Sequence, residues 1–400
     1  MTPKIKIINI IKKSAIGAVA RKMYCFMRTM KNKCREKMIR FYPICKNKIV
    51  FINFNGKGYG CNPKYVAQEI IKQKLPVKLV WLVSDMSEEM PQEIKKVQWG
   101  SFEAKRELST ARVWIKNIKN FTFVDKRKGQ YYIQVWHGNM PLKYIEQDAE
   151  STLSTTYVEQ SKRESQMTDL MLAGCRWQEE LMREKFWYNG KILSVGIPRN
   201  DIFFHNTFAT RQKIMNYFHI AEGSGIILFA PTFRNAENNC LYEIDSKNLM
   251  LAAERRFHKK FVIMKRLHPL VKQGKKINQG EAEIDATDYS DMQELLVAAD
   301  ILVTDYSGCM YDFSLMKKPV FLLGRDYAEY VETERGMYAD VTKLPFPFAR
   351  TERELWKNIE IYDDHKYLEE LGQLWEELQT YDNGHASELV VAEIKKVMAL

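Results

Sequence analysis

Short apolar runs alternate with segments of helical periodicity along most of the chain. Runs rich in β-branched residues predict buried strands at 49–54, 78–84, 113–115, 121–124, 132–135, 168–172, 194–196, 226–229, 261–265, 301–304 and 320–323. Helical spacing predicts helices at 103–110, 177–186, 205–223 and 292–298, and a helical apolar stripe follows residue 345. Strands that alternate with helices are typical of doubly wound parallel sheets, so the pattern predicts an α/β protein.

Polar residues stand directly after the predicted strand at 301–304. Residues 305–308 have turn composition, and apolar residues at helix spacing then run from Met310 to Met316 before Pro319 ends the helix. Ligands of parallel sheets bind outside the carboxyl ends of strands, and helix N-termini hold anions. Residues 304–308 are therefore predicted to meet a phosphate. The alternative is an ordinary capped turn between strand and helix.

Three other predicted strands end in the same way. His137 follows 132–135, Thr232 and Arg234 follow 226–229, and Arg266 and His268 follow 261–265. A histidine at a strand's carboxyl end can reach a binding site, and its pKa suits a general base. The alternative is a packed histidine that satisfies a backbone carbonyl.

Two further turns have recognisable chemistry. Residues 55–60 form a glycine-rich turn, after which Asn62 is expected to cap a helix with Pro63 at its first position. This turn is not the GxGxxG dinucleotide pattern. Farther along, Arg199 lies in a proline- and asparagine-containing turn, where its planar fork suits an anion.

Composition narrows the function classes. The chain has 400 residues, enough for two or three domains, and a net charge of +11, which favours an anionic partner. Aromatic residues are not interleaved with glycine and arginine as in RNA-binding sheets, so nucleic acid is not expected. The seven cysteines are scattered, which fits a reducing cytosol. No apolar run is long enough to span a bilayer, and no signal peptide is evident.

The first 48 residues are strongly basic, and Glu36 is their only acidic residue. Apolar residues stand between the charges, which indicates either a basic amphipathic helix on an anionic membrane or a solvated helix that packs against the body. The expected division is a basic segment at 1–48, Rossmann-like domains at 49–195 and 196–350, and helices at 351–400.

Several motifs together resemble the CDP-glycerol glycerophosphotransferase family, which includes teichoic-acid primases and polymerases. The matching segments are FNGKGYGCNPKY at 54–65, WHGNMPLK at 136–143, GIPRND at 196–201, APTFR at 230–234, RLHP at 266–269, DYSDMQELLVAADILVTDYSG at 288–308 and DNGHAS at 382–387. The chain departs from the family twice: Asn139-Met140 stands where one residue is usual, and Gly308 replaces a second serine.

The resemblance implies two Rossmann-like domains that face each other across a cleft, as in B-type glycosyltransferases. It implies transfer of glycerol phosphate from CDP-glycerol, or a related CDP-alditol, to a hydroxyl of a membrane-linked glycan or polyol-phosphate acceptor, with release of CMP. The expected location is the cytoplasmic face of the plasma membrane. The alternatives are a nucleotide-sugar glycosyltransferase of the same architecture and a basic, non-catalytic module.

The resemblance also assigns roles. His137 is expected to be the base, and His268 to contact the diphosphate or protonate the leaving phosphate. Asp305 is expected to orient the site, with no metal ion or other cofactor. The expected substrate-binding residues are Gly138, Arg199, Pro231, Thr232, Arg234, Arg266, Ser290, Asp291, Thr304, Asp305, Ser307 and Gly308.

Overall fold

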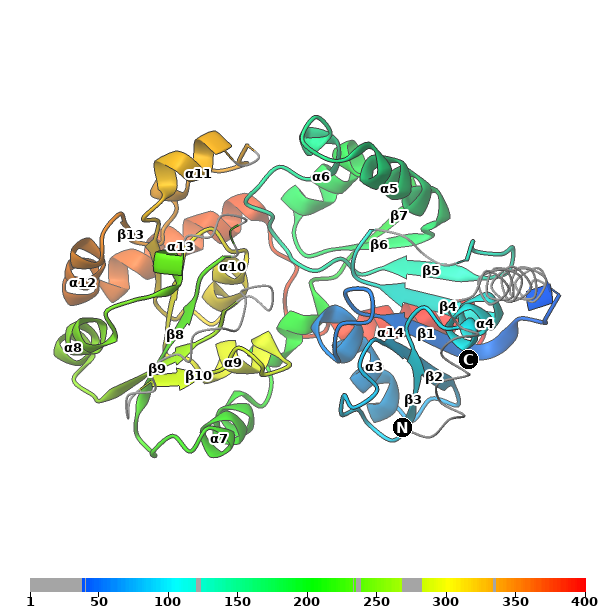
Figure 1. Ribbon diagram of the computed structural model, residues 1–400, viewed down its shortest axis with the longest axis horizontal. Helices are drawn as coiled ribbons and strands as arrows, with labels where there is room; N and C mark the ends of the chain where they lie inside the picture. The colour runs from blue at the N-terminus through cyan, green and yellow to red at the C-terminus, as the bar shows by residue number, and fades with distance from the viewer. Residues whose placement is uncertain are drawn as a thin grey trace, which may run out of the picture.

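The strands of the protein form two parallel sheets, which lie side by side in Figure 1. The computed structural model describes residues 38–39, 41–119, 124–232, 234, 239–267, 283–333 and 336–400. One sheet is built from residues 45–194, and the other from residues 225–349. The α/β prediction is therefore confirmed.

The first sheet has seven strands in the order β3-β2-β1-β4-β5-β6-β7. They are β1 (Cys45–Ile52), β2 (Lys78–Val83), β3 (Ile94–Gln98), β4 (Ala111–Lys116), β5 (Tyr131–Gln134), β6 (Leu170–Ala173) and β7 (Lys191–Ser194). All neighbouring pairs are parallel. The order reverses between β1 and β4, so the loops after these strands flank the point where such sheets bind ligands.

Helices cover both faces of the first sheet. Ile49 and Phe51 pack in a cluster with α3 (Cys61–Lys72) and α14 (Ala386–Met398), whereas Val50 and Ile52 pack with α4 (Phe102–Thr110). Successive strand side chains point to opposite faces, so a strand segment buried on both sides is apolar throughout, as Ile49–Ile52 of β1 is. The other helices of this half are η1 (Glu146–Ala149), α5 (Thr155–Met167) and α6 (Arg176–Lys185).

The second sheet repeats the same topology with six strands, in the order β10-β9-β8-β11-β12-β13. They are β8 (Gly225–Ala230), β9 (Phe261–Lys265), β10 (Glu283–Asp285), β11 (Ile301–Thr304), β12 (Val320–Leu323) and β13 (Phe348–Ala349). Its switch point lies between β8 and β11, whose carboxyl ends the sequence singled out. The described helices between residues 198 and 360 are η2 (Pro198–Phe203), α7 (Thr207–Tyr217), η3 (Asn239–Tyr242), α8 (Ser246–Phe257), α9 (Met292–Ala298), α10 (Cys309–Ser314), α11 (Tyr327–Thr333), η4 (Val341–Lys343) and α12 (Glu352–Glu360).

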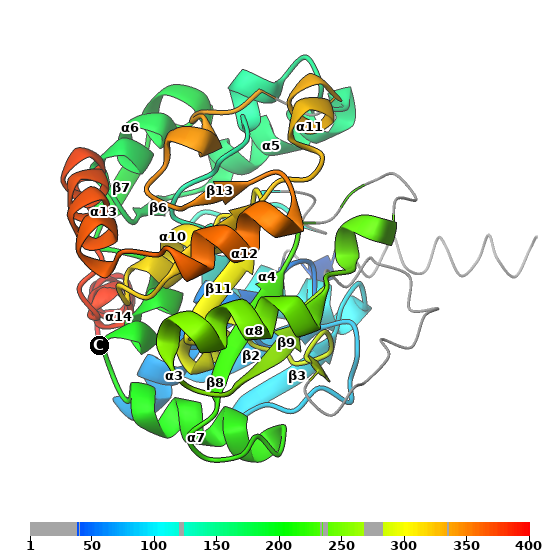
Figure 2. The same cartoon turned by 90° about the vertical axis from the view of Figure 1, so that its left-hand side faces the viewer.

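The C-terminal helices connect the two halves. In Figure 2, α12 and α8 lie side by side over the second sheet, and α13 (Asp364–Leu378) adds Tyr367 and Leu371 to the core of that half. The chain then crosses to the first half, where Tyr381 N donates to Gly174 O at 2.8 Å. The last helix, α14, finally packs against α3, far from the helices that precede it in sequence (Figure 1).

The structure corrects the predicted role of Asn62. The helix begins at Cys61, its N-cap is Gly60, and Asn62 is fully buried. The Asn62 amide nitrogen donates to the carbonyls of Val135 at 2.8 Å and Trp136 at 2.9 Å. The prediction was wrong because tertiary contacts with the loop after β5 outcompete a local cap.

Several element boundaries also differ from the pattern. The strand β7 ends at Ser194, where the sequence predicted a start; α7 ends at Tyr217 rather than at 223; and α10 ends at Ser314. The strands β3, β10 and β13 and the helix α5 were not predicted. The predicted strand at 121–124 falls mainly on residues outside the described ones, and Val124 is not in a strand.

Most of the basic N-terminal segment lies outside the described residues, so its amphipathic interpretation stays a prediction. The described chain begins with Met38 and Ile39, and residues 45–48 already belong to β1. Within the described ranges, the structure contains no helix that combines the length and the hydropathy needed to cross a bilayer.

Candidate active site

His137 directly follows Trp136 in the loop after β5. Its Nδ1 lies 2.9 Å from the carbonyl oxygen of Asn117. A carbonyl oxygen can only accept, so Nδ1 carries the proton and Nε2 carries the lone pair. No residue in the described part of the chain forms a hydrogen bond with Nε2. This is the tautomer that a general base acting through Nε2 requires.

Burial keeps the imidazole neutral. It lowers the pKa of His137 to about 4; the hydrogen bond to Asn117 raises the pKa, and the nearby Arg199 guanidinium lowers it further. The ring also packs edge-on against Phe54, with centroids 5.7 Å apart. At neutral pH the ring is therefore uncharged and able to accept a proton.

The Asn117 side chain fixes the carbonyl that holds His137. Its Oδ1 accepts from Phe54 N at 2.9 Å, and its Nδ2 donates to Asn53 Oδ1 at 2.8 Å. Phe54 and Trp136 have φ values of 39° and 49°. Aromatic residues rarely adopt positive φ, and such strain gathers at functional sites. The loops after β1, β4 and β5 thus form one strained unit around the histidine.

An ion-pair network occupies the ends of β8 and β11. The buried Asp305 carboxylate accepts from Thr232 N at 2.9 and 3.0 Å and pairs with Arg234 at 2.9 Å. Arg234 Nε donates to Asp326 at 2.7 Å. Burial alone would lower the pKa of Arg234, but Asp326 and Asp305 raise it above its usual range. The network orders the main chain of both loops.

Aromatic rings extend this network toward the first half. The Arg234 guanidinium lies 5.0 and 4.5 Å from the ring centroids of Tyr306 and Tyr330, which stack on each other. Lys143 Nζ, from the loop after β5, lies 4.4 Å from the centroid of Tyr330. The Lys143 backbone also forms an isolated bridge with Met337. These contacts fix the position of Lys143, which follows the extra residue of the motif at 136–143.

The loop after β5 also meets the turn after β11. A Cβ on Gly308 would lie 3.1 Å from the Met140 carbonyl oxygen, tighter than most real contacts. Asn139-Met140 and Gly308 are the two departures from the resembled family. The structure therefore places them in contact, since the longer loop occupies space that a serine at 308 would need.

Two predicted phosphate ligands use their guanidinium groups inside the protein. Arg199 Nη1 donates to the His137 carbonyl at 2.5 Å, and its Nη2 pairs with Asp312 at 2.5 Å. Arg266 Nη1 donates to the carbonyls of Ala286 at 2.9 Å and Thr287 at 2.7 Å. Both arginines shape loops in the structure, and their expected contact with phosphate stays a prediction.

Asp291 and Thr304 also have protein partners. Asp291 caps α9 through Gln293 N at 2.8 Å and pairs with Lys64 of α3 at 2.5 Å, which joins the two halves. Thr304 Oγ1 donates to Ala230 O at 2.7 Å and so ties β11 to β8.

The remaining predicted residues lie near the same loops or outside the description. Gly138 and Ser307 are half-buried, Pro231 is buried, and Ser290 is exposed. The Ser290 carbonyl lies 3.4 Å from a Cβ built on Gly60, at the junction between the halves. His268 lies outside the described residues. Among those described, no three His, Cys, Asp or Glu side chains cluster as metal ligands would.

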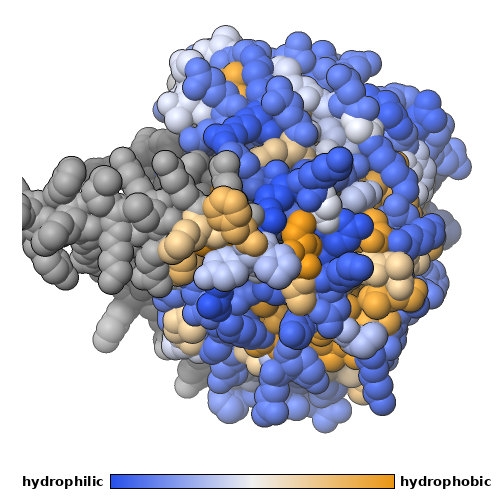
Figure 3. Space-filling view, turned by 90° about the vertical axis from the view of Figure 1, so that its right-hand side faces the viewer, coloured by the Kyte–Doolittle hydropathy of each residue, from blue (hydrophilic) through white to orange (hydrophobic). Residues whose placement is uncertain are grey.

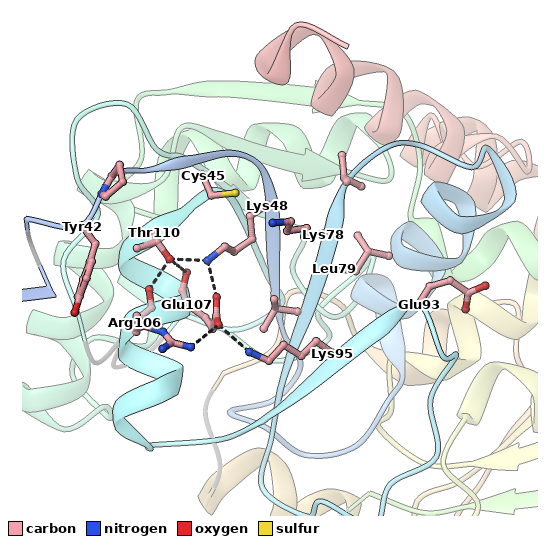
Figure 4. A pocket seen from close by; sticks show the side chains of 13 residues that line it. Tyr42, Cys45, Lys48, Lys78, Leu79, Glu93, Lys95, Arg106, Glu107 and Thr110 are labelled. Carbon is pink, nitrogen blue, oxygen red and sulfur yellow. Dashed lines mark hydrogen bonds and ion pairs between the residues drawn. The ribbon is translucent and has the colours of Figure 1, made fainter.

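A charged groove of about 680 Å³ lies elsewhere, at the amino ends of β1 and β2 (Figure 4). His137 stands at the carboxyl end of the sheet, so this groove is not the candidate site. Glu107 pairs there with Lys48 at 2.6 Å and Lys95 at 3.0 Å.

The family model described as CDP-Glycerol:Poly(glycerophosphate) glycerophosphotransferase matches residues 35–396. The chain belongs to this family. The match covers both sheets and every segment on which the sequence resemblance was based.

Individual relatives agree with the assignment to this family. The chain is 27% identical over 393 residues to a teichoic acid poly(glycerol phosphate) polymerase of Bacillus spizizenii, covering 90% of this chain and 98% of that protein. It is 29% identical over 367 residues to a teichoic acid glycerol-phosphate transferase of Staphylococcus aureus, covering 88% and 93%. A poly(glycerol phosphate) polymerase of Staphylococcus epidermidis is 29% identical over 361 residues; the match covers 86% of this chain but only 49% of that longer protein.

Solved structures give the same result. The wall teichoic acid polymerase TagF superposes with a TM-score of 0.84 at 27% identity, covering 95% of this chain and 97% of that chain. A TagF variant studied after a 30-minute soak with CDPG superposes with a TM-score of 0.82 at 26% identity, covering 96% and 98%.

Sequence reasoning missed several residues that organise the loops around the candidate site. Asn117, Asp312 and Asp326 belong to none of the motifs that the sequence singled out, and Asp382 was noted only as part of DNGHAS. Each is buried or half-buried and binds loops distant in sequence. Among these four, only Asp312 offered a signal, as a charged residue between two aromatic residues; each of the other three stands beside another polar residue.

Proposed function

We propose that the protein transfers glycerol phosphate from CDP-glycerol to a hydroxyl of a glycan or polyol-phosphate acceptor of the cell envelope, and releases CMP. The observation that carries this proposal is His137, a neutral imidazole whose Nε2 lone pair lies in the loop that meets the Ser307–Gly308 turn. Phosphoryl transfer needs a positioned base beside groups that hold phosphate oxygens. Family membership supports the choice of donor.

Two domains on either side of a cleft would bring these groups together. We assign the acceptor to the domain at 49–195 and the CDP-donor to the domain at 196–350, with the basic segment 1–48 and the helices 351–400 outside them. The repeated strand order supports this division, because each half has its own switch point. The contact between Met140 and Gly308 puts the two strand-end loops at one place.

The chemistry follows from these positions. His137 Nε2 takes the proton of the acceptor hydroxyl as its oxygen attacks the β-phosphorus of the donor. The bond between that phosphorus and the bridging oxygen breaks, and CMP leaves with the bridging oxygen. Main-chain N–H groups of 307–308 and the loop of Thr232 would meet the phosphate oxygens. His268 is assigned to the leaving phosphate on its motif alone.

Product analysis tests the proposal. The purified protein is incubated with a membrane acceptor and, separately, CDP-glycerol, CDP-ribitol and UDP-sugars. CMP together with a new phosphodiester is expected from a CDP-alditol. Release of a nucleoside diphosphate from a UDP-sugar, with no CMP from either CDP-alditol, would instead identify a glycosyltransferase.

We propose that no divalent ion takes part, since the sequence has no DxD motif in a position suited to a metal. Turnover should survive EDTA followed by gel filtration. Loss of activity on chelation, with recovery on adding Mg²⁺ or Mn²⁺, would contradict this assignment.

We further propose peripheral binding to the anionic cytoplasmic face of the membrane. Met38, Phe41 and Tyr42, within the basic segment 1–48, are 55%, 87% and 47% exposed. Figure 3 shows this side of the molecule, with apolar side chains at the surface beside the grey residues. Basic and apolar residues together bind anionic interfaces.

Vesicle sedimentation tests the binding. The full chain should sediment with vesicles that contain phosphatidylglycerol, and less so at 0.5 M salt or after deletion of residues 1–37. Phe41→Ser should weaken sedimentation, and Phe208→Ser, at an exposed phenylalanine far from the segment, should not. Equal sedimentation of all four samples would exclude the segment as the anchor.

A further inference from the structure

Four motifs from distant parts of the sequence meet in one buried polar junction. Arg199 and Asn200 come from η2, Asp312 from α10, Asp382 from the segment before α14, and Asn139 from the loop that carries His137. The junction lies where the two halves join, because η2 contacts α3 and α14 of the first half and α9 of the second, while α10 packs on β11 and β12 of the second sheet.

Arg199 connects the catalytic loop to the phosphate turn. One end of its fork donates to the His137 carbonyl, and the other donates to Asp312 in the helix that begins directly after Gly308. Its main-chain N–H also donates to Asn62 Oδ1 at 3.0 Å. The Arg199 side chain is 12% exposed and that of Asp312 is 1% exposed. A planar fork held at both ends fixes the distance between its two partners.

Asp382 holds the same loop from the other side. Its carboxylate accepts from Asn139 Nδ2 at 2.9 Å, Ile197 N at 2.8 Å and Asn200 Nδ2 at 3.4 Å. Because Asn200 also donates to Asp312 at 3.3 Å, the two aspartates share one amide. The C-terminal segment therefore anchors both the His137 loop and η2.

The junction also contains buried polar atoms without partners among the described residues: Asn139 Oδ1, Asn200 Oδ1 and Arg199 Nε. The Nδ2 atoms of both asparagines face Asp382, so after either side-chain amide flips its Oδ1 would accept from a neutral amide at position 382. This makes Asp382→Asn a mild change and Asp382→Ala a disruptive one.

We infer that Arg199, Asp312 and Asp382 are positioning residues, which set the His137 loop against the phosphate turn of the other half without contacting the donor. The inference rests on the proposed function, because transfer is its main readout. It assigns to Arg199 a different task from the phosphate contact that its motif suggested.

Kinetics separates the two tasks. Arg199→Lys keeps the charge but loses the fork, so it should lower kcat about 10–100-fold while the calorimetric Kd for CDP-glycerol stays within about twofold, since misplacement of a reacting group by about 1 Å costs about 100-fold. Asp312→Asn should behave in the same way. A phosphate ligand would show the reverse: weaker donor binding in Arg199→Lys and unchanged binding and kcat in Asp312→Asn. That result would overturn the inference.

A matched pair elsewhere provides the control. Arg211 of α7 pairs with Asp300 at 3.0 Å and donates to a backbone carbonyl, but it lies away from the junction. Arg211→Lys and Asp300→Asn should leave kcat within about twofold. An equal loss of kcat in the control pair would mean that the effect is general destabilisation, and would overturn the inference.

The Asp382 series adds a rescue. Asp382→Ala should lower kcat about tenfold, and Asp382→Asn should restore most of it, because the amide can hold Ile197 N and both asparagines. Equal kcat in Asp382→Ala and the native protein would contradict a positioning role, even if Arg199 variants fail to fold.

A last readout does not depend on transfer. In ¹⁵N NMR the pKa of His137 should rise in Arg199→Met and stay unchanged in Arg211→Met, since burial and the nearby Arg199 charge both disfavour the imidazolium and only Arg199→Met removes that charge. If the native protein has no transfer activity but the pKa of His137 still rises in Arg199→Met, the proposed function is refuted and the positioning role of the junction is retained. An unchanged His137 pKa in both variants would refute the junction.

Discussion

The two sheets have the same topology, but the loops at their carboxyl ends differ in charge and in hydrogen bonding. After β5, a single half-buried histidine is held by backbone carbonyls and strained residues, and burial leaves it uncharged. After β8 and β11, charges are dense but neutralise one another in the Arg234–Asp305–Asp326 network. The first half therefore carries a neutral histidine whose Nε2 can accept a proton, and the second half carries loops whose main chain is held in place by the ion pairs.

The difference shows that a charged residue in a motif need not touch a substrate. A buried charge is tolerated only when it is paired and hydrogen-bonded. Arg199 and Arg234 are therefore paired with aspartates inside the protein, where they hold the loops in place. The uncharged histidine needs no such partner, and its Nε2 can face a substrate. The following predictions test this contrast from the largest expected effect to the smallest.

Removal of the lone base should have the largest effect. His137→Ala should lower kcat about 10²–10⁴-fold, the usual contribution of a positioned base, with donor binding nearly unchanged because the donor is assigned to the other half. His365→Ala, at an exposed histidine in the first turn of α13, is the control. A His137→Ala protein with native kcat at saturating acceptor would remove the base assignment.

Removal of the buried cation should cost stability instead. Arg234→Met leaves Asp305 and Asp326 buried without a counterion, which should lower the free energy of unfolding by about 3–5 kcal/mol. Arg255→Met breaks a pair whose arginine is 68% exposed and should cost at most about 1 kcal/mol. Urea unfolding of both variants measures the difference, and equal costs would show that the network adds nothing.

The junction should make stability pH-dependent. Burial, together with the nearby Asp312 and Asp201 carboxylates, raises the pKa of Asp382 from 3.8 to about 7, against the hydrogen bonds from Ile197 and Asn200 that lower it. The folded state then keeps a proton that the unfolded chain loses, so stability should fall as pH rises from about 4 to 7 and level off above. The fall is at most about 4 kcal/mol, at about 1.4 kcal/mol per pKa unit.

Asp382→Asn tests that dependence. The variant should lose the fall, so its melting temperature relative to the native protein should increase between pH 4 and pH 7. Parallel curves for the two proteins over this window would mean that Asp382 titrates normally.

The smallest effect concerns the pH profile of transfer. With the pKa of His137 near 4 in the free enzyme, the acid limb of kcat/KM should lie near pH 4 rather than near 6.5. The acid limb of kcat should lie at a higher pH than that of kcat/KM, because the negative charge of bound phosphates favours the imidazolium form of His137. An acid limb of kcat/KM near pH 6.5 that disappears in His137→Gln would contradict this prediction, because it would show that His137 titrates as an exposed histidine does.

Local patterns were sufficient where neighbours in sequence decide the outcome. The apolar runs 261–265, 301–304 and 320–323 became β9, β11 and β12 with the predicted bounds or nearly so, because strands buried on both faces are apolar throughout. The predicted helix 292–298 became α9 with Asp291 as its cap. Charged or short strands such as β3 and β13 escaped prediction because their pairing depends on the rest of the sheet.

The sequence by itself determined the α/β class, the family and the strand ends where chemistry gathers, since motifs and periodicity are local properties. Only the tertiary structure decided what each of those residues contacts. The Asn62 side chain, expected to cap a helix, binds carbonyls of the loop after β5. Arg199 binds both the His137 carbonyl and Asp312, and Asp382 accepts a hydrogen bond from Asn139. A hydrogen bond is short-ranged and directional, and the chain positions that share one here lie tens to hundreds of residues apart.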